Sequence, residues 1–240
     1  MIGIIGAMDK EIDELRELML SESDNQNGCT VTRMSSMDFY QGTLYGHEVV
    51  LVRSGVGKVN AACAAQILIT YFKVRAIINT GIAGSLNADI DIGDIVLSVD
   101  ALEHDMNVRS LGYGQGVVPD QDISIYVADS KLRKIAKAAY EAAGLDVKLF
   151  EGRVLTGDYF ISGDKVKDKL VSEFNGLCAE MEGGAIAHAA WLSQIPFLII
   201  RSISDKADNS AHMDYPEFQK IALKNEMRLI KEFFRILDTL

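Results

Sequence analysis

The sequence predicts one α/β domain over residues 1–240, with a mixed central β-sheet flanked by helices on both faces. Three observations lead to this prediction. Short runs of β-forming residues alternate with helical patterns along most of the chain. Three strand-like runs follow one another directly near the N-terminus, so part of the sheet is expected to be an antiparallel meander. The length of 240 residues suits one large domain, and no repeat, low-complexity stretch or linker divides it.

The strands are predicted from apolar runs that are bounded by turn residues. In the meander, Tyr45 and Gly46 form a turn before the last of its three strands. A buried strand at 76–79 leads into the segment Thr80-Gly81-Ile82-Ala83-Gly84. The predicted strands are 2–7, 31–34, 37–44, 48–53, 76–79, 94–98, 147–155 and 197–202.

The helices are predicted from apolar residues at helical spacing and from their end signals. Gly144 closes the helix at 131–143, because glycine readily adopts the left-handed cap conformation. The last helix is expected to begin at Asp214, an acidic N-cap with Glu217 three residues later. Residues 165–169, the densest basic segment, indicate a solvated helix face. The predicted helices are 11–20, 57–72, 131–143, 182–193 and the one that begins at 214.

Composition excludes several classes of protein. Apolar residues make up 48% of the chain and only 3 residues are proline, which allows a sizeable core. The net charge of −10 argues against a nucleic-acid partner. The 3 cysteines lack C-x-x-C spacing and the 4 histidines lack ligand spacing, so neither a disulfide framework nor a metal site is expected. No signal-peptide pattern or membrane-length apolar run is visible, so a soluble cytoplasmic protein without a membrane partner is expected.

Three acidic residues stand at predicted strand ends or helix starts. Glu11 opens the first helix, Glu182 lies in the sequence Glu-Met-Glu after a short apolar run, and Asp205 follows the strand at 197–202. One carboxyl group that gives a proton, one that takes a proton and one that holds sugar hydroxyls are what hydrolysis of a glycosidic bond needs. The alternative for each is an ordinary capping role, because carboxylates are also favoured at helix starts.

The glycine-rich turn at 54–58 does not match the common nucleotide-binding motifs. It lacks the upstream glycine and the hydroxyl residue after Lys58 that a P-loop uses. Asn60 stands where the dinucleotide fingerprint needs its third small residue. What remains is a strand that turns tightly into a helix, which is compatible with ligand contact or with simple turn geometry.

Taken together, six segments resemble one family. They are Gly6-Ala7-Met8-Asp9-Lys10-Glu11, Ser54-Gly55-Val56-Gly57-Lys58-Val59, Asn79-Thr80-Gly81-Ile82-Ala83-Gly84, Gly157-Asp158-Tyr159-Phe160-Ile161, Glu180-Met181-Glu182 and Arg201-Ser202-Ile203-Ser204-Asp205. In this order they resemble the bacterial 5′-methylthioadenosine/S-adenosylhomocysteine nucleosidases of the purine nucleoside phosphorylase superfamily. The resemblance covers nearly the whole chain and implies a nucleoside phosphorylase-like fold.

The resemblance implies hydrolysis of the N-glycosidic bond of 5′-methylthioadenosine and S-adenosylhomocysteine, without a cofactor. Glu11 would activate the water, and Asp205, oriented by Ser204, would protonate or hydrogen-bond the purine N7. Glu182 would hold the ribose hydroxyls. The other implied substrate-binding residues are Met8 and Met181 on the sugar, Phe160 and Ile161 at adenine, Val56 and Ile82 in the matching turns, and Val108, Leu111, Tyr113, Pro119 and Tyr215 around the 5′-alkylthio pocket.

The segment 108–119 is implied to reach that pocket from the neighbouring subunit of a homodimer. Its apolar residues and glycines make it costly to leave in water, which favours the same assembly. Two positions depart from the family pattern: Ile82 replaces a small hydroxyl residue, and Leu111 stands where an aromatic residue is expected.

Two other functions compete with hydrolysis. A phosphorylase would need a cluster of basic side chains around phosphate. In the quoted turn and strand motifs, Lys58 and Arg201 are the only two basic residues that could bind the anion. A binding protein without catalysis would be expected to lack one of the acids, whereas Glu11, Glu182 and Asp205 are all present. The sequence does not rank methylthioadenosine, S-adenosylhomocysteine, 5′-deoxyadenosine and aminofutalosine as substrates.

Overall fold

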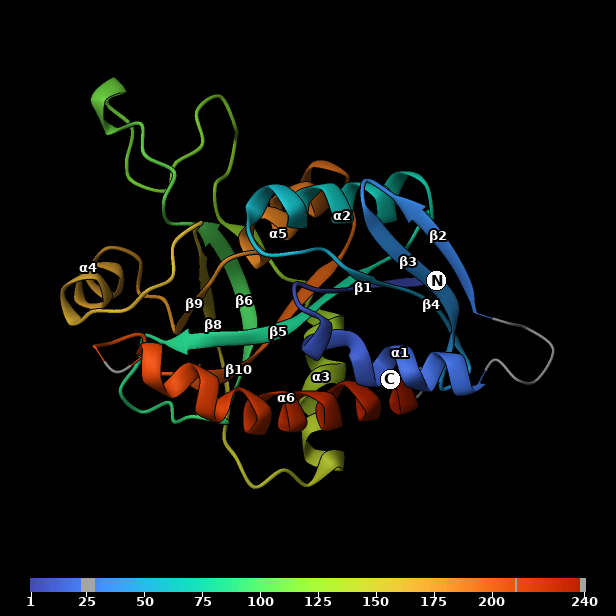
Figure 1. Cartoon of the computed structure of the whole chain (residues 1–240). Helices are drawn as coiled ribbons and strands as arrows, with labels where there is room; N and C mark the ends of the chain where they lie inside the picture. Colours follow the sequence, from blue (N-terminus) through green and yellow to red (C-terminus); the bar gives the residue numbers. More distant parts are fainter. Residues whose placement is uncertain (23–28, 210, 238–240) are drawn as a thin grey trace.

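A computed structural model describes residues 1–22, 29–209 and 211–237, without the side chains of residues 22 and 212–217. A mixed β-sheet lies at its centre and helices cover it on two sides (Figure 1). The helices α2 and α5 pack together on one side, and α1, α3 and α6 lie on the other. This arrangement confirms the predicted α/β fold with helices on both faces.

The strands of the described chain belong to one sheet, which closes on itself at one end. Its order is β10-β6-β8-β9-β5-β1-β4-β3-β2, β7 pairs with β6, and β10 also pairs with β5. The predicted meander is the antiparallel run β2-β3-β4. The strands are β1 Ile2–Gly6, β2 Thr30–Met34, β3 Met37–Leu44, β4 His47–Arg53, β5 Ile77–Ser85, β6 Ile95–Glu103, β7 Tyr126–Val127, β8 Leu149–Thr156, β9 Cys178–Glu180 and β10 Phe197–Asp205.

The helices begin and end close to the predicted positions. Gly144 caps α3 in the left-handed conformation, as predicted, and the segment 165–169 lies in a helix, α4. The prediction that the last helix begins at Asp214 is wrong, because the helix starts at Ala211. The helices are α1 Asp9–Glu22, α2 Lys58–Thr70, α3 Ser130–Ala143, α4 Asp164–Phe174, α5 Gly183–Leu192 and α6 Ala211–Ile236, with a 3₁₀ turn η1 at Arg109–Leu111.

Three strands extend several residues beyond their predicted ends. The added segments contain polar residues, which ended the apolar runs used for the prediction. The strand β5 continues past Asn79 to Ser85, and β10 continues past Ser202 to Asp205. Both added segments are paired with each other in parallel and are almost wholly buried. Hydrogen bonds between strands and burial inside the closed part of the sheet maintain the extended backbone there, although the residues are no longer uniformly apolar. The third strand, β6, likewise continues past Ser98 to Glu103.

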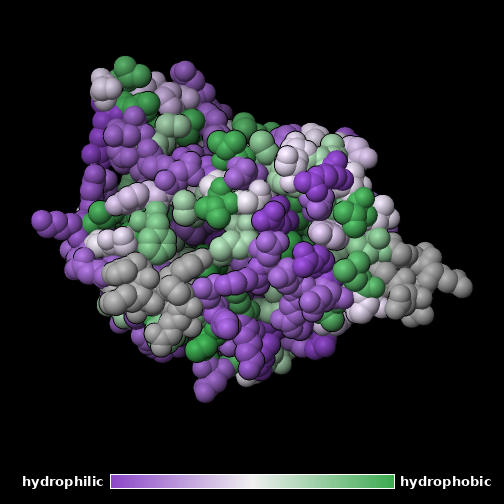
Figure 2. Space-filling model, in the orientation of Figure 1, coloured by the Kyte–Doolittle hydropathy of each residue, from purple (hydrophilic) through white to green (hydrophobic). Residues whose placement is uncertain are grey.

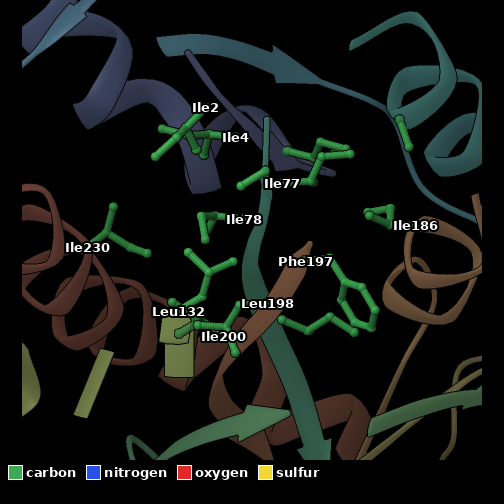
Figure 3. Packing of buried hydrophobic residues seen from close by; sticks show 14 of the residues in the cluster. Ile2, Ile4, Ile77, Ile78, Leu132, Ile186, Phe197, Leu198, Ile200 and Ile230 are labelled. Carbon is green, nitrogen blue, oxygen red and sulfur yellow. The ribbon is translucent and has the colours of Figure 1, made fainter. Parts of the chain in front are cut away.

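The core lies on both faces of the strand pair β5 and β10. Ile77 and Phe197 occupy paired positions and point toward Ile186 of α5 (Figure 3). The next residues along the two strands, Ile78 and Leu198, point to the opposite side, where α3 and α6 lie. Because successive residues of a strand face opposite ways, apolar residues in a row predict a strand that is buried on both faces. No helix of the described chain is long and apolar enough to cross a membrane.

Candidate active site

A cavity of about 440 Å³ lies at the carboxyl ends of β1, β5, β9 and β10. In open α/β sheets this edge is where ligands bind. Nine of the residues predicted for the site line it: Met8, Glu11, Val56, Ile82, Phe160, Met181, Glu182, Ser204 and Asp205. The remaining lining residues are Ala7, Ala83, Gly84, Ala179 and Glu180. Segments that are far apart in the sequence therefore meet around one cavity.

Glu11 lies in the first turn of α1, buried at 2% exposure, and its carboxylate accepts three backbone hydrogen bonds. Oε2 accepts from the amides of Ala7 (2.6 Å) and Met8 (2.9 Å), and Oε1 accepts from the amide of Ile82 (3.2 Å). Burial raises the pKa of Glu11, and the charge of Arg201 and the three amide donors oppose that rise. The result is an oriented carboxylate with increased proton affinity, which suits a general base.

Asp205 ends β10 and is buried at 2% exposure. Its Oδ1 accepts a hydrogen bond from the amide of Ala207 (2.9 Å), and its Oδ2 accepts one from the hydroxyl of Ser204 (2.9 Å). A Cβ added at Gly84 would lie only 2.7 Å from Asp205 Oδ1, so a glycine is needed there. The carboxyl group is thus fixed at the cavity wall by its own strand and by β5.

Glu182 precedes α5, and its Oε1 accepts from the amide of Gly57 over 2.9 Å. This hydrogen bond shows what the glycine-rich turn does: it contacts a carboxylate of the site, while Val56 beside it lines the cavity. Burial, followed by the charge of Glu180, raises the pKa of Glu182 to about 7. A carboxyl group in this state can both accept and donate hydrogen bonds near neutral pH, which suits binding of vicinal hydroxyls.

Arg201 lies beneath the cavity and is almost fully buried. Its Nη2 donates to Asn79 Oδ1 (2.6 Å) and to Glu180 Oε2, and lies 3.8 Å from Glu182 Oε2. Glu180 in turn accepts from the amides of Glu182 (3.1 Å) and Gly183 (2.7 Å). Glu180 therefore has a structural role, as the partner of a buried cation and the cap of α5, while Glu182 faces the cavity.

Some predicted residues do not line the cavity. Ile161 lines a small adjoining cavity instead. Val108, Leu111, Tyr113 and Pro119 belong to the segment between β6 and β7, which projects away from the body (Figure 1). Leu111 is 71% exposed. The side chain of Tyr215 lies outside the described residues, so its predicted role is not tested.

The sequence analysis did not predict that Arg201 and Glu226 belong to a cluster of buried charged groups with Glu11, Glu180 and Glu182. Arg201 stands within an otherwise apolar strand, and a lone charge in such a run is a signal of a buried ion pair. Glu226 is fully buried and shares the face of α6 that carries Leu223, Met227 and Ile230. A carboxylate on the apolar face of a predicted helix was the signal that could have found it.

The basic residue of the glycine-rich turn is not available to an anion. Lys58 Nζ donates to Asp105 Oδ1 (2.7 Å) and Glu103 Oε2 (3.2 Å). The residues that line the cavity include no lysine or arginine in the part of the chain that the structure describes. Among the same residues, no group of three or more His, Cys, Asp or Glu side chains is arranged to hold a metal ion.

Comparison with known proteins agrees with this geometry. A model of the phosphorylase superfamily matches residues 1–235. The 5′-methylthioadenosine/S-adenosylhomocysteine nucleosidase of Halalkalibacterium halodurans is 40% identical over 230 residues, which is 95% of each chain. The chain belongs to this nucleosidase family of the phosphorylase superfamily. The predicted family and the predicted nucleoside phosphorylase-like fold are confirmed.

Solved structures of related enzymes share the fold over nearly the whole chain. The enzyme of Neisseria meningitidis, in complex with methylthio-immucillin-A, has a TM-score of 0.90 at 33% identity and covers 98% of both chains. The futalosine hydrolase of Helicobacter pylori has a TM-score of 0.89 at 28% identity, and the match covers 100% of this chain and 97% of that one.

Proposed function

We propose that this protein hydrolyses the N-glycosidic bond of 5′-methylthioadenosine and S-adenosylhomocysteine, releasing adenine and the 5′-thioribose product. The observation that carries the proposal is that Glu11, Glu182 and Asp205 line one buried cavity. Membership of the nucleosidase family gives the reaction class. The futalosine hydrolase shares the fold at 28% identity, which supports aminofutalosine as a further substrate. We also include 5′-deoxyadenosine, because it is an adenine nucleoside that differs from 5′-methylthioadenosine only at the 5′ position.

Each acid has its own part in the proposed reaction. When the bond breaks, positive charge develops on the ribose and negative charge on adenine. Asp205, held by Ser204, protonates the purine N7 and so neutralises the leaving group. Glu11 removes a proton from the water that attacks the anomeric carbon, and Glu182 binds the ribose hydroxyls. Met8, Met181 and Phe160 supply the apolar surface against the sugar and the base.

Hydrolysis is favoured over phosphorolysis by the charge of the cavity. A phosphate site is expected to offer cationic donors, but Lys58 is bound by Glu103 and Asp105, and Arg201 is bound by Glu180. Glu11 would in addition repel the anion. A nucleoside-binding protein without catalysis is the second candidate, and it would bind the nucleoside without releasing adenine.

We also propose a homodimer whose cavities are each completed by the partner. The projecting segment around η1 shows some hydrophobic residues at its tip (Figure 2, upper left). Leu111 and Tyr113 of this segment are 71% and 38% exposed. Val59 of α2 is 74% exposed and Leu192 of α5 is 62% exposed, and both line one surface hollow. Exposed apolar surface of this extent is typical of an interface, and a two-fold dimer would cover it.

The proposed setting is the cytoplasm, where the enzyme would remove by-products of methyl transfer and return their sulfur toward methionine. The cysteines Cys29, Cys63 and Cys178 are all unpaired, as is usual in a reducing compartment.

The decisive experiment is incubation of the purified protein with 5′-methylthioadenosine, with and without phosphate. We expect adenine and free methylthioribose at the same rate in both reactions. Formation of methylthioribose 1-phosphate, or a rate that depends on phosphate, would identify a phosphorylase instead. Release of no adenine while the nucleoside binds would identify a binding protein.

A further inference from the structure

Glu226 is a fully buried carboxyl group that the proposed hydrolysis does not use. It lies on α6, which packs against β5 and β10 below the cavity. Its Oε1 accepts a hydrogen bond from the amide of Gly81 over 2.6 Å, whereas its Oε2 is buried and lacks a hydrogen bond within normal geometry among the described residues. A buried carboxyl group is costly, so its presence against β5 calls for a structural reason.

The residue after Gly81 connects Glu226 to the proposed base. The amide of Ile82 donates to Glu11 Oε1 over 3.2 Å, so two consecutive amides of β5 are each held by a carboxyl group. One comes from α6 and the other from α1. The backbone from Gly81 to Ile82 is therefore held by Glu226 on one side and by Glu11 on the other.

Gly81 has no space for a side chain. A Cβ at this position would lie 2.6 Å from Glu11 Oε1 and would also overlap the guanidinium group of Arg201. The backbone of β5 thus passes directly against the base and against the buried cation. Any displacement of Gly81 would change the distance between Ile82 and Glu11.

Burial keeps Glu226 neutral, so that it does not compete with the base as a second charge. Burial raises the pKa of Glu226 to about 8, and the negative charge of Glu11 adds to the rise. The Gly81 amide, the charge of Arg201 and the Thr80 hydroxyl act in the opposite direction. Arg201 is also attracted to Glu180, Glu182 and Glu11, so one cation serves four carboxyl groups. With its pKa raised to about 8, Glu226 is mainly protonated at neutral pH, and it supplies an acceptor for Gly81 without placing another negative charge beside Glu11.

We propose that Glu226 is a positioning residue: by holding the Gly81 amide it keeps the Ile82 amide on Glu11, and so it sets the orientation and proton affinity of the base. This inference rests on the proposed function, in which Glu11 activates water. The side chain of Ile82 cannot donate a hydrogen bond, so at this position the backbone amide is the donor to Glu11.

Two variants of Glu226 test whether its role is to accept the hydrogen bond from Gly81. Glu226→Gln keeps an oxygen that can accept from Gly81, whereas Glu226→Met keeps the length and removes the acceptor. Glu226→Ala replaces the methionine variant if that one does not fold. Asn225→Ala is the matched control, because Asn225 also ties α6 to the body of the protein and does not line the cavity. Its Nδ2 donates to the carbonyl oxygen of Gly93 (3.2 Å), in the turn before β6.

The readout is the pH dependence of kcat/KM for 5′-methylthioadenosine, whose acid limb reports the base of the free enzyme. In Glu226→Met the Ile82 amide moves away from Glu11, so the pKa of Glu11 rises. We expect the acid limb to move to higher pH by about one unit, with kcat reduced about tenfold, the equivalent of one charge-assisted hydrogen bond. Glu226→Gln should keep the acid limb of the wild type and most of its kcat, and Asn225→Ala should change only the melting temperature.

An acid limb that stays in place in a folded Glu226→Met or Glu226→Ala protein would overturn the inference. So would a Glu226→Gln protein that loses as much activity as the methionine variant. If the wild-type protein itself releases no adenine, the proposed function fails and the inference falls with it. An active wild type with an unshifted variant overturns the role of Glu226 alone.

Discussion

The hydroxyl of Ser204 donates a hydrogen bond to Asp205 Oδ2 over 2.9 Å, and both residues are buried at the end of β10. The two side chains are neighbours in the sequence, and successive residues of a regular strand point to opposite faces. They meet because the register between β10 and β5 shifts between Ile203 and Asp205. This irregularity turns Asp205 toward its own neighbour and toward the cavity, as bulges near active sites often do.

Asp205→Asn is expected to reduce kcat by about 10²–10⁴-fold, because the amide keeps the shape of the side chain but cannot give a proton to N7. Binding of adenine should remain measurable, since the cavity is unchanged. Steady-state kinetics with 5′-methylthioadenosine and calorimetry with adenine test this prediction. Asp94→Asn is the control, as Asp94 is also buried but only accepts the amides of Asp91 and Lys148, 2.8 Å away in each case. A wild-type kcat in Asp205→Asn would remove Asp205 from the mechanism.

Glu11→Gln is expected to abolish turnover while leaving much of the affinity for 5′-methylthioadenosine. The glutamine oxygen can still accept an amide hydrogen bond, but the side chain can no longer take a proton from water, so the loss appears in kcat and not in KM. Single-turnover release of adenine from the pre-formed complex measures this step. If KM rises and kcat stays unchanged, Glu11 only binds the substrate.

The stability of Glu226→Gln relative to the wild type is expected to increase with pH. The pKa of Glu226 is raised from 4.5 to about 8, so the folded protein holds a proton that the unfolded chain releases above pH 4.5. The stabilising contribution of this group is therefore complete below pH 4.5 and is lost as the pH rises through about 8. Glutamine does not titrate and avoids the loss. Melting temperatures of the two proteins at pH 5, 6.5 and 8 should diverge by a few degrees; a constant difference would contradict the raised pKa.

Activity is expected to survive dialysis against a chelator. The proposed reaction needs only proton transfers and hydrogen bonds from Glu11, Glu182 and Asp205. The measurement is release of adenine before dialysis against EDTA, after it, and after addition of Mg²⁺, Mn²⁺ or Zn²⁺. Activity that disappears on dialysis and returns with one ion would show that a metal takes part.

The protein is expected to be a dimer of twice the 26.3 kDa chain mass in light scattering. Val59→Glu places a charge on an apolar side chain that is 74% exposed on α2, and should shift the population to monomers. If the partner's projecting segment completes the 5′ pocket, these monomers should lose affinity for 5′-methylthioadenosine more than for adenine. A wild-type monomer with full activity at assay concentration would refute the shared cavity.

The acids of the site could be predicted because they stand at strand ends or helix starts and within motifs that resemble one family. Glu182 and Asp205 lie at or just after strand ends, and Glu11 lies in the first turn of the helix that follows β1. Such positions converge at one edge of a sheet. The partners that hold them could not be predicted. Glu11 is held by the amide of Ile82, 71 residues away, and Glu182 by that of Gly57, 125 residues away.

By itself the sequence determined the alternation of strands and helices, the meander, the cap at Gly144 and the family. These features depend on local periodicity, turn residues and ordered motifs, all of which are present in the chain before it folds. Only the tertiary structure decided that Glu180 neutralises Arg201, that β5 and β10 close the sheet, and that Glu226 reaches Gly81. The physical reason is that the cost of a buried charge depends on which distant groups surround it, and the folded chain alone brings those groups together.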